Sequence, residues 1–395
     1  MLPLSHLARQ IKPSATLAAG ALAKQMRAQG ITVHDFSVGE PDFPTPPHIC
    51  QAAADAVAKG ATHYTPSSGL PELRRAIAGR YEKLYGLRYT PEQVVVTSGA
   101  KHALHIALCA VLNPGEEVVL PAPFWTSYTD LIEMTGAVHR TVPTTMEQHF
   151  KMSAEQLRRT VTPRSRVLIL NSPANPTGSV YTKEELTAIG EVVIEKDLIV
   201  LSDEIYECLT YDGVKAHCFA ALRPEFAART VTVSGASKSY AMTGWRMGWA
   251  GGPKEIIDAM GSLQSQETGC PSSVSQAAAL AAVTGEQSCV ETFRKDLEGR
   301  RNLVCDLLTR IPGLKWAKPQ GAFYLFFDVS SYFGRTLGGV TVNDSVGFCK
   351  SLLESARVNL VPGSSFGAEG FVRLSYATGR QQLEAGLAEL AKFLA

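Results

Sequence analysis

The residues best suited to chemistry lie in the segment 230–251. A run of β-branched residues at its start ends in a Ser-Gly pair, and Lys238 then follows among small, uncharged residues. Arg246 lies eight positions further on. A lysine with no acid in its own segment loses its proton at low cost, and the neutral amine is the nucleophile that forms a Schiff base. The pattern therefore suggests a reactive lysine, although an isolated lysine in a loop is more often an ordinary surface residue.

The elements around this segment must position such a lysine. From about residue 47 to residue 269 the chain alternates between helices and short apolar strands, a pattern typical of a mainly parallel sheet covered by helices on both faces. The expected strands cover residues 94–97, 117–120, 138–141, 167–170, 198–202, 230–233 and 247–250. Ligands of such sheets bind beyond the carboxyl ends of the strands. We therefore expect the functional residues to follow strands directly.

A turn of small residues follows the first of these strands and opens an apolar helix. The turn consists of Ser98, Gly99, Ala100 and Lys101. Free backbone N–H groups and the positive end of the helix dipole make such a turn suitable for binding phosphate. A simple tight turn capped by Ser98 is the alternative.

Three further strand ends carry aromatic or polar side chains. Trp125 follows the strand at 117–120, and its flat indole suits an aromatic ligand. Asn175 lies in a turn-rich stretch after the strand at 167–170, in which two X-Pro bonds, at Pro173 and Pro176, could be either cis or trans. Asp203 follows the strand at 198–202, where a buried carboxylate needs a cation unless it caps a helix.

The order Ala-Ser-Lys followed by Thr-Gly-x-Arg-x-Gly over 236–248 resembles the cofactor attachment site of class I pyridoxal-phosphate aminotransferases, which have fold type I. The resemblance extends along nearly the whole chain and is closest to bacterial aspartate aminotransferases. It implies an α/β fold with a mainly parallel, seven-stranded sheet flanked by helices, and a smaller α+β domain built from both termini. The implied parts are residues 1–46, which pack with the small domain, residues 47–290, which form the cofactor domain, and residues 291–395, which form the small domain.

The resemblance also implies roles for individual residues, with pyridoxal 5'-phosphate as the cofactor. Lys238, Asp203 and Tyr206 are the implied catalytic residues: the lysine holds the cofactor and moves protons, the aspartate pairs with the ring nitrogen, and the tyrosine contacts the ring oxygen together with Asn175. Trp125 would cover the ring. The implied phosphate ligands are the turn at Ser98, Gly99, Ala100 and Lys101, the side chain of Arg246, and Tyr64 from the partner subunit of a homodimer.

One departure from the family affects the phosphate site. The family serine three residues before the lysine is Gly235 here. Its hydroxyl contact is therefore either absent or made by Ser234 or Ser237.

The substrate contacts implied by the resemblance are spread over the chain. Arg373, a charge inside an apolar strand, would bind the α-carboxylate opposite Gly39, since guanidinium pairs with carboxylate in a fork. The residues expected at the distal carboxylate of a dicarboxylic substrate are Lys12, Ser14, Thr16 and Lys101, besides Trp125 and Asn175 on the substrate face.

We expect an aminotransferase that carries the amino group of aspartate to 2-oxoglutarate in a ping-pong cycle. In having Lys12, the chain also resembles family members that accept prephenate. The stretch 266–270 departs from the family, because Glu267 and Cys270 replace residues that usually line the partner's pocket. Aromatic, prephenate or other amino donors and a β-lyase reaction therefore remain alternatives, and a regulator without turnover is a remote one.

The composition gives no indication of a charged binding partner such as nucleic acid or a membrane surface. The 395 residues carry a formal net charge of +1, and 45% of them are hydrophobic. Neither nucleic acid nor a membrane surface is therefore expected as a partner. Eight widely spaced cysteines and the lack of an apolar leader favour free thiols and a cytoplasmic location.

His102 and His105 lie one helical turn apart, a spacing also found at metal sites. No acid or third ligand stands near them in the sequence. We therefore expect ordinary helix histidines and no metal.

Overall fold

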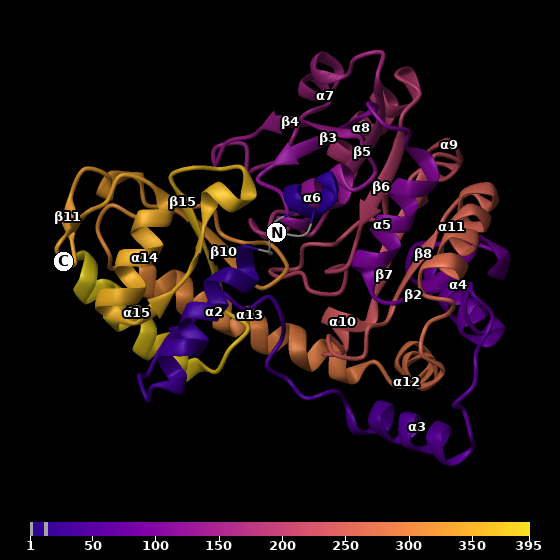
Figure 1. Ribbon diagram of the computed structural model, residues 1–395, viewed down its shortest axis with the longest axis horizontal. Coiled ribbons are helices and arrows are strands. Elements are labelled where there is room, and N and C mark those ends of the chain that lie inside the picture. The colour runs from indigo at the N-terminus through magenta and orange to yellow at the C-terminus, as the bar shows by residue number, and fades with distance from the viewer. Residues whose placement is uncertain (1–2, 12–14) are drawn as a thin grey trace.

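The computed structural model describes residues 3–11 and 15–395, and within them a seven-stranded sheet forms the centre of the larger part of the molecule (Figure 1). Its strand order is β2-β8-β7-β6-β5-β3-β4. The strands are β2 (Val94–Thr97), β3 (Glu117–Ala122), β4 (Val138–Pro143), β5 (Ser165–Asn171), β6 (Ile199–Asp203), β7 (Thr230–Gly235) and β8 (Gly248–Gly251). Only β8 runs antiparallel to its neighbours β2 and β7. The expected mainly parallel α/β sheet is confirmed.

Both faces of this sheet are buried, as the continuous apolar runs predict. Val95 packs into the apolar cluster under α5 and α11, whereas Val94 and Val96 pack into the cluster on the opposite face, under α4 and α12. Successive side chains of a strand alternate between faces, so an unbroken apolar run needs helices on both sides. The helices of this part are α3 (Pro47–Ala58), α4 (Pro71–Tyr85), α5 (Ala100–Val111), α6 (Ser127–Glu133), α7 (Ala154–Thr160), α8 (Lys183–Glu195), α9 (Pro224–Ala227), α10 (Ala236–Ser239), α11 (Lys254–Glu267) and α12 (Ser273–Thr284).

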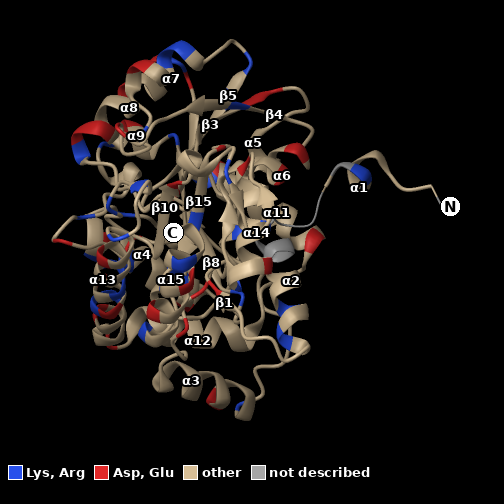
Figure 2. Cartoon of the chain, turned by 90° about the vertical axis from the view of Figure 1, so that its left-hand side faces the viewer, with Lys and Arg blue, Asp and Glu red and all other residues tan. Residues whose placement is uncertain are grey.

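A smaller region combines the C-terminal elements with the first described strand. Its antiparallel sheet has the order β14-β15-β10-β9, and β1 pairs in parallel with β13. The strands are β1 (His34–Asp35), β9 (Lys315–Trp316), β10 (Tyr324–Asp328), β11 (Thr336–Leu337), β12 (Val340–Thr341), β13 (Val358–Asn359), β14 (Val361–Pro362) and β15 (Phe371–Ser375). The helices are α2 (Ala15–Ala28), α13 (Ser288–Leu308), α14 (Ser345–Ala356) and α15 (Arg380–Leu394), whereas α1 (His6–Gln10) projects away from the rest of the chain (Figure 2). The early strand β1 thus joins the C-terminal part, while the expected boundaries at residues 46 and 290 stay a prediction.

The surface carries charges of both signs. Figure 2 shows Lys and Arg side by side with Asp and Glu along α13, where Arg294 pairs with Glu291 and Glu298. None of the helices that the structure describes is both long and apolar enough to cross a membrane. All eight cysteines lie in the described ranges and are free, in agreement with the expectation of unpaired thiols.

Candidate active site

A cavity of about 670 Å³ opens beyond the carboxyl ends of β5, β6 and β7, and the smaller region closes its other side. It collects residues from both ends of the chain, including most of those selected from the sequence. The predicted residues in its wall are Gly39, Ala100, Lys101, Trp125, Asn175, Asp203, Tyr206, Ser237, Lys238, Arg246 and Arg373. Residues that were selected largely because they follow strands therefore line one common cavity.

Lys238 lies in α10, the short helix that follows β7. Its Nζ atom donates a hydrogen bond of 2.6 Å to the carbonyl of Gly39. Burial lowers the pKa of Lys238 to about 8, because a charged ammonium loses its hydration there. The positive charges of Arg246 and Arg373 also lower this pKa, whereas Glu40 raises it. The result is an amine that can gain or lose a proton close to neutral pH.

Asp203 ends β6 at the cavity and is only 4% exposed. Burial raises the pKa of Asp203 to about 6. The hydroxyl of Tyr128 opposes this shift by donating to Oδ2 at 2.7 Å, and the Ile205 N–H donates to Oδ1 at 3.2 Å. Two hydrogen bonds thus hold a buried carboxylate in one orientation, with its charge available to a ligand.

Two residues around Asp203 were missed from the sequence. Tyr128 lies in α6, three residues after Trp125, so one helical turn brings it to the same site. Asn171, the last residue of β5, donates from Nδ2 to the backbone carbonyl of Asp203 at 2.9 Å and accepts from the Asn175 N–H at 2.8 Å. Asn171 had a usable signal, because it ends a strand as Asp203 does.

Arg373 is the most deeply buried charge of the site, at 1% exposure. Its Nη2 atom donates to the Ser37 carbonyl at 2.7 Å, and its Nη1 atom donates to Oδ1 of Asn175 at 3.0 Å. The Nε atom has no hydrogen-bond partner, and no carboxylate of residues 3–11 or 15–395 forms an ion pair with this guanidinium. A buried cation without a counter-ion is costly, so this position calls for an anionic ligand.

Tyr206 and Tyr324 face each other in the cavity wall. Their hydroxyl groups lie 2.9 Å apart, and the guanidinium of Arg373 lies 4.5 Å from the centre of the Tyr324 ring. Burial raises the pKa of Tyr206 far above its ordinary value, so this hydroxyl keeps its proton. Tyr324 comes from β10, 118 positions after its partner, and the sequence analysis did not select it.

The turn after β2 has the shape expected of an anion-binding turn. Gly99 caps α5 with φ of 90°, and a Cβ atom at this position would lie 2.4 Å from Nη2 of Arg246. Glycine therefore permits both the left-handed backbone and the approach of the arginine. Ser98 and Gly99 do not line the cavity, whereas the adjacent Ala100 does, and Lys101 extends over the ring of Trp125 with Nζ 4.9 Å from its centre.

The structure separates the two candidates for the missing serine hydroxyl. Ser234 is buried in β7, outside the cavity wall, whereas Ser237 lines the cavity next to Lys238. A Cβ atom at Gly235 would lie 2.8 Å from the carbonyl of Met247, so the present backbone has no room for a side chain there. The geometry favours Ser237.

The remaining predicted residues lie away from this cavity or outside the description. Tyr64 is 95% exposed and does not line the cavity, and the neighbouring Thr65 N–H donates to Sγ of Cys270 at 3.4 Å. Lys12 and Ser14 lie outside the described residues, and the side chain of Thr16 is not described either.

The structure settles one detail that the sequence left open and corrects one expectation. The peptide bonds preceding Pro173 and Pro176 are both cis. The expectation that His102 and His105 have no acid near them is wrong, because Glu267, 165 positions after His102, lies 3.0 Å from its Nε2 atom. Folding of α11 against α5 brings this carboxylate to the histidines.

Comparison with known proteins agrees with this geometry. Residues 31–390 match the family model for aminotransferase class I and II. The chain belongs to this family. It is 46% identical to an aspartate aminotransferase of Geobacillus stearothermophilus, over 99% of this chain and 98% of the relative, and 43% identical to an aspartate/prephenate aminotransferase of Cereibacter sphaeroides, again over 99% and 98%.

Solved structures agree over the full length. The aspartate aminotransferase of Rhizobium meliloti superimposes with a TM-score of 0.96 at 40% identity, covering 100% of this chain and 99% of that one. The enzyme of Thermus thermophilus with maleate gives 0.94 at 42% identity, covering 100% of both. The protein is thus an aminotransferase of a pyridoxal-phosphate-dependent family, with amino acids and 2-oxo acids as substrates.

Proposed function

We propose that the protein transfers the amino group of L-aspartate to 2-oxoglutarate in a ping-pong cycle, with pyridoxal 5'-phosphate held in the cavity. The observation that carries this proposal is the buried guanidinium of Arg373, which faces the cavity without a counter-ion among the described residues. Both proposed substrates bring an α-carboxylate that would neutralise it.

The cavity fits the cofactor at three points. Asp203 is a buried carboxylate to which no lysine or arginine of the described chain is ion-paired, which suits a protonated ring nitrogen. The turn at Gly99 and the side chain of Arg246 suit a phosphate, and Ser237 supplies a hydroxyl beside them. When bound, pyridoxal phosphate supplies a conjugated ring that spreads the negative charge left on the substrate's α-carbon.

Residues of the chain bind the substrate and move the proton. Arg373 binds the α-carboxylate with the help of Asn175 and the backbone at Gly39. This contact orients the Cα–H bond toward Lys238, whose amine takes the α-proton and would then donate a proton to the cofactor rather than back to the α-carbon. A group with a pKa of about 8 can do both near neutral pH. Trp125 covers one face of the site and limits the access of water.

Two further contacts concern the cofactor ring. The Tyr206 hydroxyl and the Asn175 side chain are proposed to contact the ring oxygen. Oδ1 of Asn175 accepts from Arg373, which leaves its amide nitrogen as a donor, and the Tyr206 hydroxyl can accept from Tyr324 while it donates to the ring oxygen.

The preference for aspartate rests on Lys101 and on the relatives. Lys101 lines the cavity and has no ion-pair partner in the described ranges, so a second substrate carboxylate can bind it. Lys12, Ser14 and Thr16 are proposed to assist. The relatives named above act on aspartate or on aspartate and prephenate. Prephenate, which also carries two carboxylates, is therefore the second candidate.

We also propose a homodimer in which Tyr64 reaches the partner's phosphate site. The Tyr64 side chain is 95% exposed, and it lines a second hollow of about 670 Å³ between α3 and α12. A second copy of the chain would cover both. The cytoplasmic location stays a prediction.

The decisive experiment is the first half-reaction. The holoenzyme is mixed with one amino acid at a time, without a 2-oxo acid, and the absorbance of the bound cofactor is followed. We expect rapid conversion with aspartate and glutamate and slow conversion with phenylalanine.

Other outcomes separate the alternatives. Rapid conversion with aromatic amino acids only would refute the dicarboxylate preference and direct attention to Glu267 and Cys270. Release of products over many turnovers without a 2-oxo acid would indicate a lyase.

A further inference from the structure

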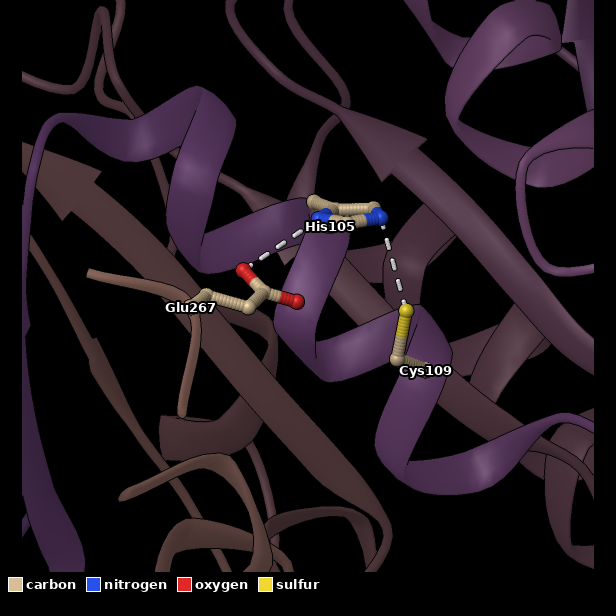
Figure 3. A group of neighbouring side chains, drawn as sticks. All are labelled: His105, Cys109 and Glu267. Atoms are coloured by element: carbon tan, nitrogen blue, oxygen red, sulfur yellow. Dashed lines mark hydrogen bonds and ion pairs between the residues drawn. The ribbon is translucent and has the colours of Figure 1, made fainter. Parts of the chain in front are cut away.

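A cluster of potential metal ligands lies beside the cofactor cavity and is not used by the proposed reaction. His105 and Cys109 lie on one face of α5, one turn apart, and Glu267 ends α11 directly opposite them (Figure 3). The Nε2 atom of His105 lies 3.5 Å from Sγ of Cys109, and its Nδ1 atom lies 3.7 Å from Oε2 of Glu267. The imidazole thus lies between a thiol and a carboxylate.

The distances suit a transition-metal ion. One ligand atom from each of the three residues lies within 4.8 Å of the others. Ligands at about 2.0–2.3 Å from a tetrahedral zinc ion are separated from one another by about 3.3–3.7 Å. The His105–Cys109 separation already has this value. Because one ion binds only one ring nitrogen, the side chain of His105 or Glu267 must reorient before all three ligand atoms reach the ion.

A neighbouring histidine holds the carboxylate in place. The backbone N–H of Ser98 donates to Nδ1 of His102 at 3.4 Å, so the ring proton is on Nε2. Nε2 then donates to Oε2 of Glu267 at 3.0 Å. Outer hydrogen bonds of this kind orient the carboxylates that bind metals. His102 is therefore a positioning residue rather than a ligand.

We propose that His105, Cys109 and Glu267 bind one divalent ion of the zinc class, with His102 orienting the carboxylate and water completing the coordination. An imidazole, a thiolate and a carboxylate are a ligand set that zinc accepts, and two negative charges neutralise the ion. The side chains of His105 and Glu267 are 19% and 33% exposed, which leaves a path for the ion.

The position of the site indicates its consequence. The ion would join the end of α11 to the second turn of α5, while the first turn of α5 begins at the small-residue turn around Gly99. Apart from Glu267, which is also a candidate for substrate selection, its ligands are not among the residues proposed to bind substrate. We therefore expect the ion to stabilise the folded holoenzyme without taking part in amino transfer.

The test uses holoenzyme that has been freed of metal by a chelator. Zinc binding is measured by calorimetry, and cobalt is used as a spectroscopic probe, since a Co–thiolate bond gives a charge-transfer band. We expect one ion per chain and a higher melting temperature with zinc. Loss of a ligand in Cys109→Ser or Glu267→Gln should weaken binding by about 100-fold or more, and His102→Gln by about 10- to 100-fold.

A matched control is available in the same chain. Cys289, another half-buried thiol, lies in α13, so Cys289→Ser should bind zinc as the wild type does. Unchanged affinity or an unchanged cobalt–thiolate band in Cys109→Ser would overturn the proposal, as would the absence of stoichiometric binding to the wild type. The half-reaction with aspartate should proceed in Cys109→Ser, His102→Gln and Cys289→Ser, which separates this site from the proposed function.

Discussion

The hydrogen bond from Tyr128 to Asp203 gives the sharpest prediction, because it sets the charge of the carboxylate at the centre of the site. Burial raises the pKa of Asp203 to about 6, and the Tyr128 hydroxyl stabilises the ionised form. A hydrogen bond to a charged group contributes about 1.5–3 kcal/mol, and one pKa unit corresponds to about 1.4 kcal/mol. Tyr128→Phe should therefore raise the pKa of Asp203 by about 1–2 units.

The consequence is a shift in the pH dependence of cofactor binding. The ionised carboxylate is the form that holds a cationic ring, so its contribution to affinity is present above the pKa of the apoprotein and is lost as the pH falls through that pKa. In Tyr128→Phe the loss should begin about 1–2 pH units higher than in the wild type. The measurement is a titration of the apoprotein with pyridoxal phosphate across a pH series.

A control variant removes a comparable hydroxyl elsewhere. Tyr81 and Tyr128 are both 2% exposed, but the Tyr81 hydroxyl has no hydrogen-bond partner in the part of the chain that the structure describes. Tyr81→Phe should therefore leave the midpoint where the wild type has it. Equal midpoints in Tyr128→Phe and the wild type would show that this hydroxyl does not control Asp203.

Three further predictions address the other groups of the site. Lys238→Ala should abolish covalent attachment of the cofactor and turnover; borohydride reduction followed by peptide mapping checks this, and a label on another lysine would contradict it. Arg373→Lys should lower kcat/KM for all amino acids by about 10- to 100-fold, because about one charge-assisted hydrogen bond is lost. Arg301→Lys, equally buried but ion-paired with Asp212, should instead lower the melting temperature. Lys101→Ala should reduce kcat/KM for aspartate much more than for phenylalanine; equal losses would exclude Lys101 as the ligand of the distal carboxylate.

The strands of the large sheet could be predicted because their apolar runs are local features of the sequence. The strand expected at 94–97 is β2 itself, and each of the others differs by one or two residues at one end or at both ends. The antiparallel direction of β8 could not be predicted from the sequence, because an apolar run does not indicate in which direction its strand crosses the sheet. The ends of a strand in a very small sheet are also hard to predict. In β1 only two residues, His34 and Asp35, pair with residues of β13.

The site residues that could be predicted are those that are recognisable from their own neighbourhood in the sequence. Those that were missed are recognisable only from a contact with a residue far away in the sequence. Lys238, Asp203 and Arg373 stand out as charges at or within apolar strands. Tyr128 contacts Asp203 across 75 positions. Glu267 reaches the histidines of α5 across 165 positions. No spacing rule connects residues so far apart, because the packing of whole elements decides which of them meet.

The extended segment after β1 has a consequence for which amines the site can process. The carbonyl of Ser37 accepts from Arg373, and two residues later the carbonyl of Gly39 accepts from Lys238. One short backbone segment thus binds both the carboxylate anchor and the reactive nitrogen and relates their positions. The distance between Arg373 and Lys238 therefore limits which amines can react. An amino group one carbon further from the carboxylate would lie out of reach of Lys238, whatever side chain the substrate carried. We therefore expect β-alanine to fail in the same half-reaction that accepts aspartate.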